Sequence, residues 1–190
     1  MNSTTGRTSE FDVHPLILNR WSPRAMSGEL LSHEELMTLF EAARWAPSCF
    51  NDQPWKFHYA TKDSPKWNDV FSLLVEFNQS WCKNAAALAI LTTQKNFSHN
   101  GKPNRNAISD SGAAWENLAL QASSMGLIAR GMGGYDVEKA RSFLNLPEDT
   151  EIIHMIAIGR PGKKEDLPTD LQTQETPSGR KELKEIAIAL

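Results

Sequence analysis

Two arginines and a serine alternate near the start of the chain, in the segment Arg20-Trp21-Ser22-Pro23-Arg24. In an extended segment, residues two apart point to the same side, so Arg20, Ser22 and Arg24 can converge on one anion. Two guanidinium groups and a hydroxyl group are suited to holding a phosphate. A solvated basic patch is the alternative, since short arginine-rich stretches also occur on ordinary protein surfaces.

A second group of polar side chains lies in Ala46-Pro47-Ser48-Cys49-Phe50-Asn51-Asp52-Gln53-Pro54-Trp55. This segment follows a predicted helix and precedes a predicted strand, a position at which mixed α/β folds commonly bind ligands. An ordinary turn also explains its proline, serine, asparagine and aspartate residues. The flanking tryptophans and the two amide side chains slightly favour a ligand-binding segment.

A third feature is the glycine cluster Gly131-Met132-Gly133-Gly134. Glycine allows the backbone to approach a flat ligand closely and to offer it N–H groups. A tight turn before the next predicted helix explains the cluster equally well.

Other familiar catalytic patterns are absent. The glycine cluster fails the dinucleotide-binding fingerprint because Asp136 stands where the third glycine belongs. Gly101-Lys102-Pro103 is not the phosphate-binding loop of ATPases, and the five histidines lack metal-ligand spacing. Two cysteines, Cys49 and Cys82, cannot form a disulfide scaffold or a zinc site by themselves.

Composition limits the class of protein. A chain of 190 residues with 40% apolar residues can form one sizeable packed domain. Its net charge of −3 argues against a nucleic-acid binder, which needs a cationic face. No segment approaches the ~20 apolar residues of a membrane-spanning helix, and the polar N-terminus does not resemble a secretion signal. We therefore expect a soluble protein of the cytoplasm, with neither nucleic acid nor membrane as a partner.

The elements that must position these residues follow from apolar spacing. Ser32 and Glu35 form a capping-box signature. Helical spacing predicts helices over about 32–45, 64–77 and 109–125, and a further one after Asp136. Strands are predicted from about Trp55 to Tyr59, over 85–91, 127–132 and 152–158. The continuous apolar run over 85–91 predicts a strand that is buried on both faces.

Three stretches fall outside these elements. Residues 1–12 are predicted to be a flexible tail, and Lys95 to Asn106 a mobile surface loop. One domain is predicted over 13–190, and its last thirty residues, 161–190, form a polar arm that ends on apolar Ile186–Leu190. The arm either reaches a neighbouring subunit or folds back on its own domain, and composition leaves both open.

Taken together, the chain from about Pro15 onward resembles the nitroreductase family of flavin-dependent oxidoreductases. The resemblance rests on blocks in a characteristic order: the Arg20-Ser22-Arg24 element, 42–48 with 51–55, 78–81, 110–114, the glycine cluster with Gly126-Leu127, and Arg180. It implies an α+β fold (α/β in the broad sense) with a mixed central sheet flanked by helices. It also implies an intertwined homodimer with exchanged C-terminal arms and FMN at the subunit interface.

The resemblance also implies roles for particular residues. Arg20, Ser22, Arg24 and Arg180, with Trp21 between them, would hold the phosphate and ribityl chain of FMN. Pro47, Ser48, Cys49 and Asn51 would reach the flavin that is bound mainly by the partner. Met132, Gly133 and Gly134 would lie against the isoalloxazine ring, and Asn78 is a further candidate contact.

The activity implied is hydride transfer from NADH or NADPH to FMN, then electron transfer to a nitroaromatic, a quinone or a similar electron-poor acceptor, by a ping-pong mechanism. No side chain is then needed as catalytic acid or base, because the flavin N5 carries the chemistry. The alternatives are a specialised flavin reaction, such as reductive dehalogenation or dehydrogenation of a bound substrate, and a flavin-binding protein without turnover. The loop 95–106 is the candidate cover for a specialised substrate.

Overall fold

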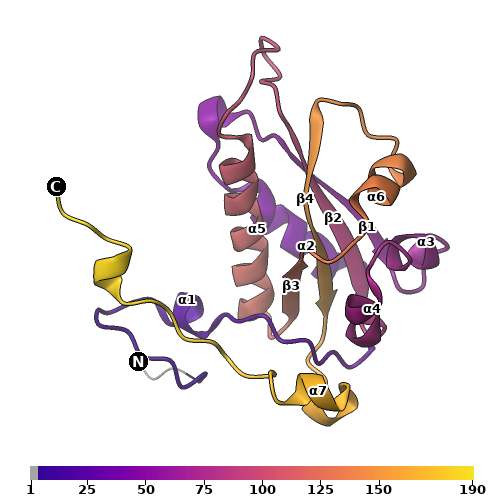
Figure 1. Cartoon of the computed structure of the whole chain (residues 1–190), viewed down its shortest axis with the longest axis vertical. Helices are drawn as coiled ribbons and strands as arrows, with labels where there is room; N and C mark the ends of the chain where they lie inside the picture. The colour runs from indigo at the N-terminus through magenta and orange to yellow at the C-terminus, as the bar shows by residue number, and fades with distance from the viewer. Residues whose placement is uncertain (1–3) are drawn as a thin grey trace.

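A four-stranded sheet lies between two helical layers in the computed structural model, which describes residues 4–190 (Figure 1). Residues 1–3 of the predicted tail lie outside the described residues. The strands are β1 (Trp55–Thr61), β2 (Ala87–Gln94), β3 (Ile128–Met132) and β4 (Thr150–Gly159). The longer helices are α2 (His33–Arg44) and α5 (Ala107–Ser124); the shorter ones are α1 (Pro15–Asn19), α3 (Trp67–Phe71), α4 (Glu76–Cys82), α6 (Val137–Phe143) and α7 (Thr169–Gln172). Three 3-10 turns complete the elements: η1 (Cys49–Asn51), η2 (Lys164–Asp166) and η3 (Leu183–Glu185).

The sheet has the strand order β1-β2-β4-β3, and every pairing is antiparallel. The predicted class, α+β with a central sheet flanked by helices, is confirmed. The expected mixed character of the sheet is corrected for the single chain, because no two of its described strands run parallel. β1 and β3 are the edge strands, and each leaves one backbone edge without a strand partner from the described chain.

The core has two halves, one on each face of the sheet. Ala87, Ala89 and Leu91 of β2 pack with α2 and α5, whereas Leu88 and Ile90 pack with α3, α4 and α6 on the other face. Strand side chains alternate between faces, so a strand covered on both sides must be apolar at every position. The prediction that this run is buried on both faces is confirmed.

Local signals set the helix ends where the sequence predicted them. Ser32 Oγ accepts a hydrogen bond from Glu35 N, and Glu35 Oε2 accepts one from Ser32 N, which together form the predicted capping box of α2. Asp136 caps α6 by accepting from Lys139 N at 2.9 Å. α5 begins at Ala107, two residues before the predicted start, and packs Ala114, Leu118 and Ala122 into the core.

The predicted helix over 64–77 is wrong in extent. The chain forms α3, leaves the helix at Ser72, and starts α4 at Glu76. Leu74 forms a β-bridge with Tyr135, and Val75 N donates to Gly134 O at 3.2 Å. These bonds to the segment after β3 compete with helical bonds, which is why apolar spacing alone missed the break.

The C-terminal arm leaves the body of the molecule after α7, whose Leu171 is buried in the core. The yellow ribbon in Figure 1 runs past α1 and ends away from the sheet. At the tip, Ile186, Ile188 and Leu190 are exposed at 67%, 77% and 123% of their reference areas. The first part of the predicted arm therefore packs on its own domain, through Leu167 and Leu171, whereas its apolar tip does not. Among the described residues, no helix is long and apolar enough to span a membrane.

Candidate functional site

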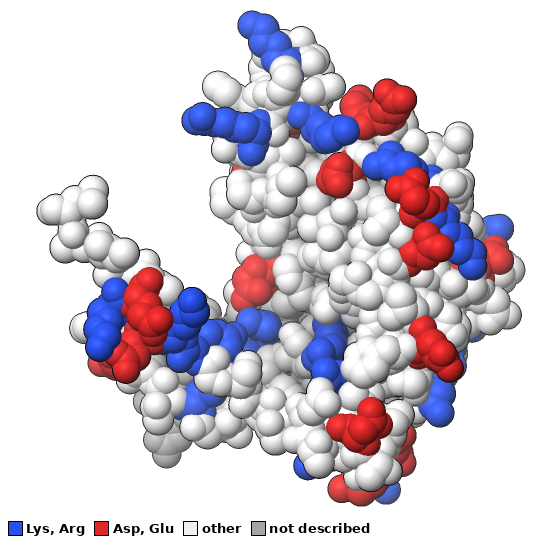
Figure 2. Space-filling model, viewed as in Figure 1, with Lys and Arg blue, Asp and Glu red and all other residues white. Residues whose placement is uncertain are grey.

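A cavity of about 230 Å³ lies where the N-terminal segment, β3 and the arm meet. In Figure 2 the lysine and arginine atoms gather at the foot of the hollow between the body and the arm. The cavity is lined by Arg7, Arg20, Trp21, Ser22, Arg24, Arg130, Gln174, Thr176, Ser178 and Arg180. Five guanidinium groups and three aliphatic hydroxyl groups therefore surround one small space, which is the chemistry of an anion site.

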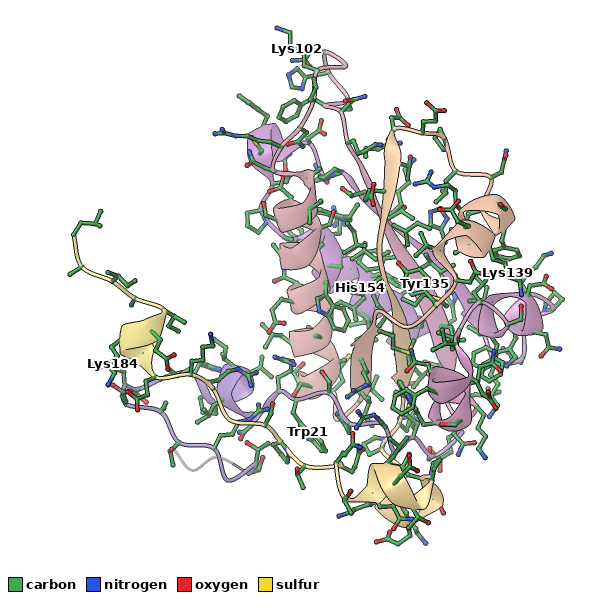
Figure 3. All side chains as sticks on the ribbon, in the orientation of Figure 1. Trp21, Lys102, Tyr135, Lys139, His154 and Lys184 are labelled. Carbon is green, nitrogen blue, oxygen red and sulfur yellow. The ribbon has the colours of Figure 1, made fainter. Side chains whose placement is uncertain are left out.

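The structure brings together the predicted residues Arg20, Trp21, Ser22, Arg24 and Arg180, although Arg180 lies 160 positions after Arg20. Arg20 Nη1 donates to Ser22 Oγ at 3.4 Å, so the alternating residues do share one side. Trp21 also lines a larger groove of about 860 Å³ between α1, the end of α5 and the arm. Figure 3 shows Trp21 below α5, between this helix and the C-terminal arm.

Two carboxylates contact the arginines of this cavity. Arg20 Nε lies 3.3 Å from Glu116 Oε1 on α5, and Arg24 Nη1 lies 3.8 Å from Glu175 Oε2 at the base of the arm. Glu175 Oε1 also accepts from the backbone N–H groups of Arg24 and Ala25, at 2.6 and 2.8 Å. The arm is thereby tied to the segment that supplies the arginines.

Buried donors remain without hydrogen bonds in this cavity. Nε of Arg20 and Nε of Arg24 are both shielded from solvent and make no hydrogen bond, although the former is within ion-pair distance of Glu116. Buried polar groups in folded proteins are nearly always satisfied. An anionic ligand in the cavity would accept the hydrogen bonds that these two guanidinium groups lack.

Arg130 is a cavity residue that sequence reasoning missed. It donates through Nη1 to Ser22 O and lies over the Trp81 ring at 5.4 Å. Burial, with nearby Arg24 adding repulsion, lowers the pKa of its guanidinium. The sequence did contain a signal for it: Arg130 is a charged residue inside an otherwise apolar predicted strand, and a buried charge needs a partner.

The predicted glycine cluster, 131–134, spans the end of β3, whose last two residues are Gly131 and Met132. Gly133 lies three residues after Arg130, about 10 Å along an extended chain, and a Cβ at Gly133 would meet no atom within 4 Å. Met132 is buried, and Cys82 Sγ donates to its Sδ at 3.2 Å, so its backbone rather than its side chain is available here. Burial raises the pKa of the Cys82 thiol.

Asn78 contacts the glycine cluster through its side-chain amide. Its Nδ2 donates to Gly134 O at 2.8 Å, and its Oδ1 accepts from Trp81 Nε1 at 3.2 Å. The side chain is buried and both ends of its amide are occupied. In this structure Asn78 therefore fixes the backbone of Gly134.

Gly134→Ala is expected to destabilise the protein by roughly 1–3 kcal/mol, as overpacked sites do. The added Cβ would lie 2.7 Å from Asn78 Nδ2 and 3.0 Å from Val75 Cγ2. Asn78 is not free to move aside, because hydrogen bonds hold both ends of its amide. Urea unfolding of the flavin-free protein measures the effect. Gly133→Ala is the matched control and should change stability little; equal stability of the two variants would contradict the expected clash.

Pro47, Ser48, Cys49 and Asn51 form a separate group around η1, and none of them lines the arginine cavity. Cys49 N donates to Asp110 Oδ2 at 3.1 Å, beside the first turn of α5. α5 is 18 residues long, about 27 Å, and the cavity residue Trp21 also lines a groove with Ser123, near the other end of this helix. One chain therefore carries two groups of predicted site residues that it does not bring together.

An exposed aromatic cluster adjoins η1. Phe50, 79% exposed, lies with its ring 5.6 Å from Phe97 and 5.8 Å from His99, both in the loop 95–106. Asp52 Oδ1 accepts from Ser98 N and Ser98 Oγ at 2.9 and 2.6 Å, which holds the loop on η1. Phe50 has a φ of 53°, a left-handed conformation that is costly for a bulky residue and common at functional sites.

His154 lies on β4, facing α5 (Figure 3). Its ring meets Trp115 edge to face at 5.1 Å, and its buried Nε2 makes no hydrogen bond. Gly131 leaves room for this ring, because a Cβ there would lie 3.4 Å from it. Burial disfavours the charged imidazolium and lowers the pKa of His154.

Acid is therefore expected to destabilise the protein through His154. As the pH falls below ~6.5, the usual pKa of histidine, the unfolded chain takes up a proton that the folded chain does not, so the free energy of unfolding falls. His154→Phe keeps a ring against Trp115 and cannot titrate. Urea unfolding between pH 8 and pH 5 should show a smaller acid-side loss in the variant. Identical pH profiles of variant and wild type would contradict the assignment.

Known proteins resemble this chain closely. A protein of Archaeoglobus fulgidus designated NADH dehydrogenase/NAD(P)H nitroreductase is 28% identical over 159 residues, which cover 80% of this chain and 87% of that protein. A solved structure described as an oxidoreductase containing FMN is 42% identical with a TM-score of 0.95, covering 99% of this chain and 96% of that one. A Parabacteroides distasonis structure of an NADH dehydrogenase/NAD(P)H nitroreductase is 27% identical with a TM-score of 0.70, covering 90% and 94%. The sequence model of the nitroreductase family matches residues 17–66 and 64–160, more than half of the chain, and the chain belongs to this family.

Proposed function

We propose that this protein is an FMN-dependent NAD(P)H oxidoreductase that acts as a homodimer. The observation that carries the proposal is the arginine cavity, with two buried guanidinium donors that make no hydrogen bond. The family membership and the FMN-containing structure of 42% identity support the same cofactor.

The residues present fit the phosphate of FMN. A phosphate monoester carries up to two negative charges and accepts several hydrogen bonds, and Arg20 Nε and Arg24 Nε are free to donate to it. Ser22, Thr176 and Ser178 add hydroxyl groups to the same cavity, and Arg180 adds a further charge. Met132, Gly133 and Gly134 would meet the ring system through their backbone, since Gly133 has open space beside it.

A dimer would complete the site. The segment with Pro47, Ser48, Cys49 and Asn51 cannot reach the cavity of its own chain, so we assign it to the flavin of the partner. The exposed apolar tip of the arm supports an exchange of arms between two copies, because burial on a partner would remove its apolar surface from water. Both cysteines are free thiols, which supports the expected reducing, cytoplasmic location.

Bound FMN would supply the redox chemistry, accepting a hydride from NADH or NADPH and giving electrons to the acceptor. The chain's own contribution is binding and electrostatics. Backbone N–H groups around Gly133 and the arginine cavity provide positive potential for the additional negative charge of the reduced state. Neither half-reaction requires a side-chain acid or base. The hydride donor and the electron acceptor bind in turn at the same place beside the flavin, which gives ping-pong kinetics.

The aromatic cluster bears on the choice of acceptor. Phe50 is the residue between Cys49 and Asn51, so a segment that reaches the partner's flavin carries Phe50, Phe97 and His99 with it. Flat, electron-poor acceptors such as nitroaromatics and quinones stack on such rings.

Phe50→Ala is expected to lower kcat/KM for an aromatic acceptor about 2- to 12-fold, the equivalent of about 0.5–1.5 kcal/mol for an aromatic pair. Reduction by NADH should fall less, because only the nicotinamide ring, a small part of that molecule, occupies the place that the acceptor takes. Phe143→Ala, on α6 across the sheet, is the matched control. An equal loss in both half-reactions would contradict an acceptor-specific role for Phe50.

Steady-state kinetics test the function. NADH and NADPH are varied against a nitroaromatic and a quinone, and parallel double-reciprocal lines are the expected result. A flavin that NAD(P)H reduces but neither acceptor reoxidises would instead favour the specialised reaction behind the loop 95–106. A flavin that neither nicotinamide reduces would mark a flavin-binding protein without turnover.

A further inference from the structure

Arg7 lies in the segment for which sequence predicted a flexible tail, yet the structure holds it firmly. Its Nη1 donates to Arg20 O at 2.7 Å and to Leu18 O at 3.3 Å, and its Nε donates to Ser178 O at 2.9 Å. One side chain therefore joins the segment that begins the arginine cluster to the C-terminal arm.

The environment of Arg7 is strongly cationic. It lines the cavity with four other arginines, and burial together with the charges of Arg180 and Arg20 lowers its pKa. Among the described residues, Glu116 and Glu175 are the carboxylates that pair with cavity arginines, so they offset two of the five positive charges. Gathering like charges in this way costs free energy unless an anion lies between them.

The three carbonyl bonds do not explain a guanidinium at this position. They use three of its five N–H donors, and they hold the planar group at the wall of the cavity. A guanidinium can bond a phosphate in a fixed geometry while its other edge bonds the backbone, which an ammonium group cannot do.

We infer that Arg7 is a further phosphate-binding arginine, which recognises the phosphate monoester of the flavin and fixes the C-terminal arm over it. This inference rests on the proposed function. It has two consequences: Arg7 contributes to the preference for FMN over riboflavin, which lacks the phosphate, and phosphate binding orders the arm through Ser178.

The first test compares affinities of the flavin-free protein for FMN and for riboflavin, by quenching of flavin fluorescence. Arg7→Ala should weaken FMN binding about tenfold or more, as expected for a lost charge-assisted hydrogen bond, and leave riboflavin binding nearly unchanged. Arg44→Ala, an exposed arginine paired with Glu41, is the matched control. Equal weakening of FMN and riboflavin binding would show that Arg7 supports the fold and not phosphate recognition, and that result would overturn the inference.

A variant that fails to fold does not end the test. Arg7→Lys keeps the charge but cannot bond the three carbonyl groups and a phosphate together, so its FMN-to-riboflavin preference should fall between those of wild type and Arg7→Ala. If Arg7→Ala does not fold and Arg7→Lys keeps the wild-type preference for FMN over riboflavin, the inference is overturned.

The second test measures the arm. Trypsin cleavage after Lys181 and Lys184, followed by mass spectrometry of the flavin-free protein, should be slowed by inorganic phosphate in wild type and in Arg44→Ala. It should be insensitive to phosphate in Arg7→Ala. If phosphate slows cleavage of the arm in Arg7→Ala as much as in wild type, Arg7 does not couple phosphate binding to the order of the arm.

These outcomes separate the two proposals. A wild-type protein that binds riboflavin as tightly as FMN would show that the cavity is not a phosphate site, and the proposed function would fail with it. A wild-type protein that prefers FMN, with the same preference in Arg7→Ala, would overturn only the role of Arg7.

Discussion

Arg20→Ala is expected to yield a protein that loses FMN during purification. Arg20 lines the phosphate cavity and has a buried Nε without a hydrogen bond. A hydrogen bond to a charged group is worth about 1.5–3 kcal/mol, and the variant also leaves the Glu116 carboxylate near the cavity without its cationic partner. Both effects act in the same direction, so FMN affinity should fall by about 100-fold or more.

The flavin absorbance per protein after gel filtration measures this loss, and titration with FMN gives the affinity. Arg44→Ala is again the matched control, because Arg44 is exposed and pairs with Glu41 on the surface of α2. Arg20→Lys should retain more FMN than Arg20→Ala but less than wild type, since a lysine cannot reproduce the planar fork. An Arg20→Ala protein that stays fully yellow would refute the phosphate role.

Removal of Ile186–Leu190 is expected to convert the dimer into a monomer and to release FMN with it. Three large apolar side chains of this tip are exposed in the single chain, and each contributes about 1.5–3 kcal/mol when fully buried. Without them the arm loses its apolar anchor on the partner. The segment around Cys49 and Asn51 then no longer meets the flavin of a second copy.

Light scattering coupled to gel filtration gives the molar mass of the truncated protein, with flavin absorbance recorded on the same column. Lys184→Ala, which removes an exposed side chain paired only locally with Glu182, should remain dimeric. A truncated protein that stays dimeric and yellow would show that the tip does not hold the subunits together.

Much of the fold was predictable from local signals. The capping box at Ser32 and Glu35 set the start of α2, and the unbroken apolar run of β2 indicated burial on both faces. These signals are contained in a few consecutive residues, so no tertiary information is needed to read them.

Other features depend on contacts between distant segments. The break between α3 and α4 arises from the pairing of Leu74 and Val75 with the segment after β3, which no local pattern records. Arg7 and Arg130 join the predicted arginines only because the N-terminal segment, β3 and the arm fold around one cavity. Local spacing therefore identified Arg20 and Arg24 as candidates but could not identify Arg7 and Arg130.

The two groups of site residues show the same limit. The residues around Cys49 and those around Arg20 are predicted to meet one flavin, but in the single chain Cys49 bonds Asp110 in the first turn of α5, whereas Arg20 pairs with Glu116 further along it. A site shared between two copies is compatible with that separation.

The central claim is that FMN binds across two copies of the chain, with its phosphate among the arginines. Its most direct test is one gel-filtration run of the wild-type protein with light scattering and visible absorbance, repeated after anaerobic addition of NADH or NADPH. The account predicts a dimer with one FMN per chain, whose yellow absorbance disappears on reduction. A colourless monomer, or a flavin held by monomers, would contradict it.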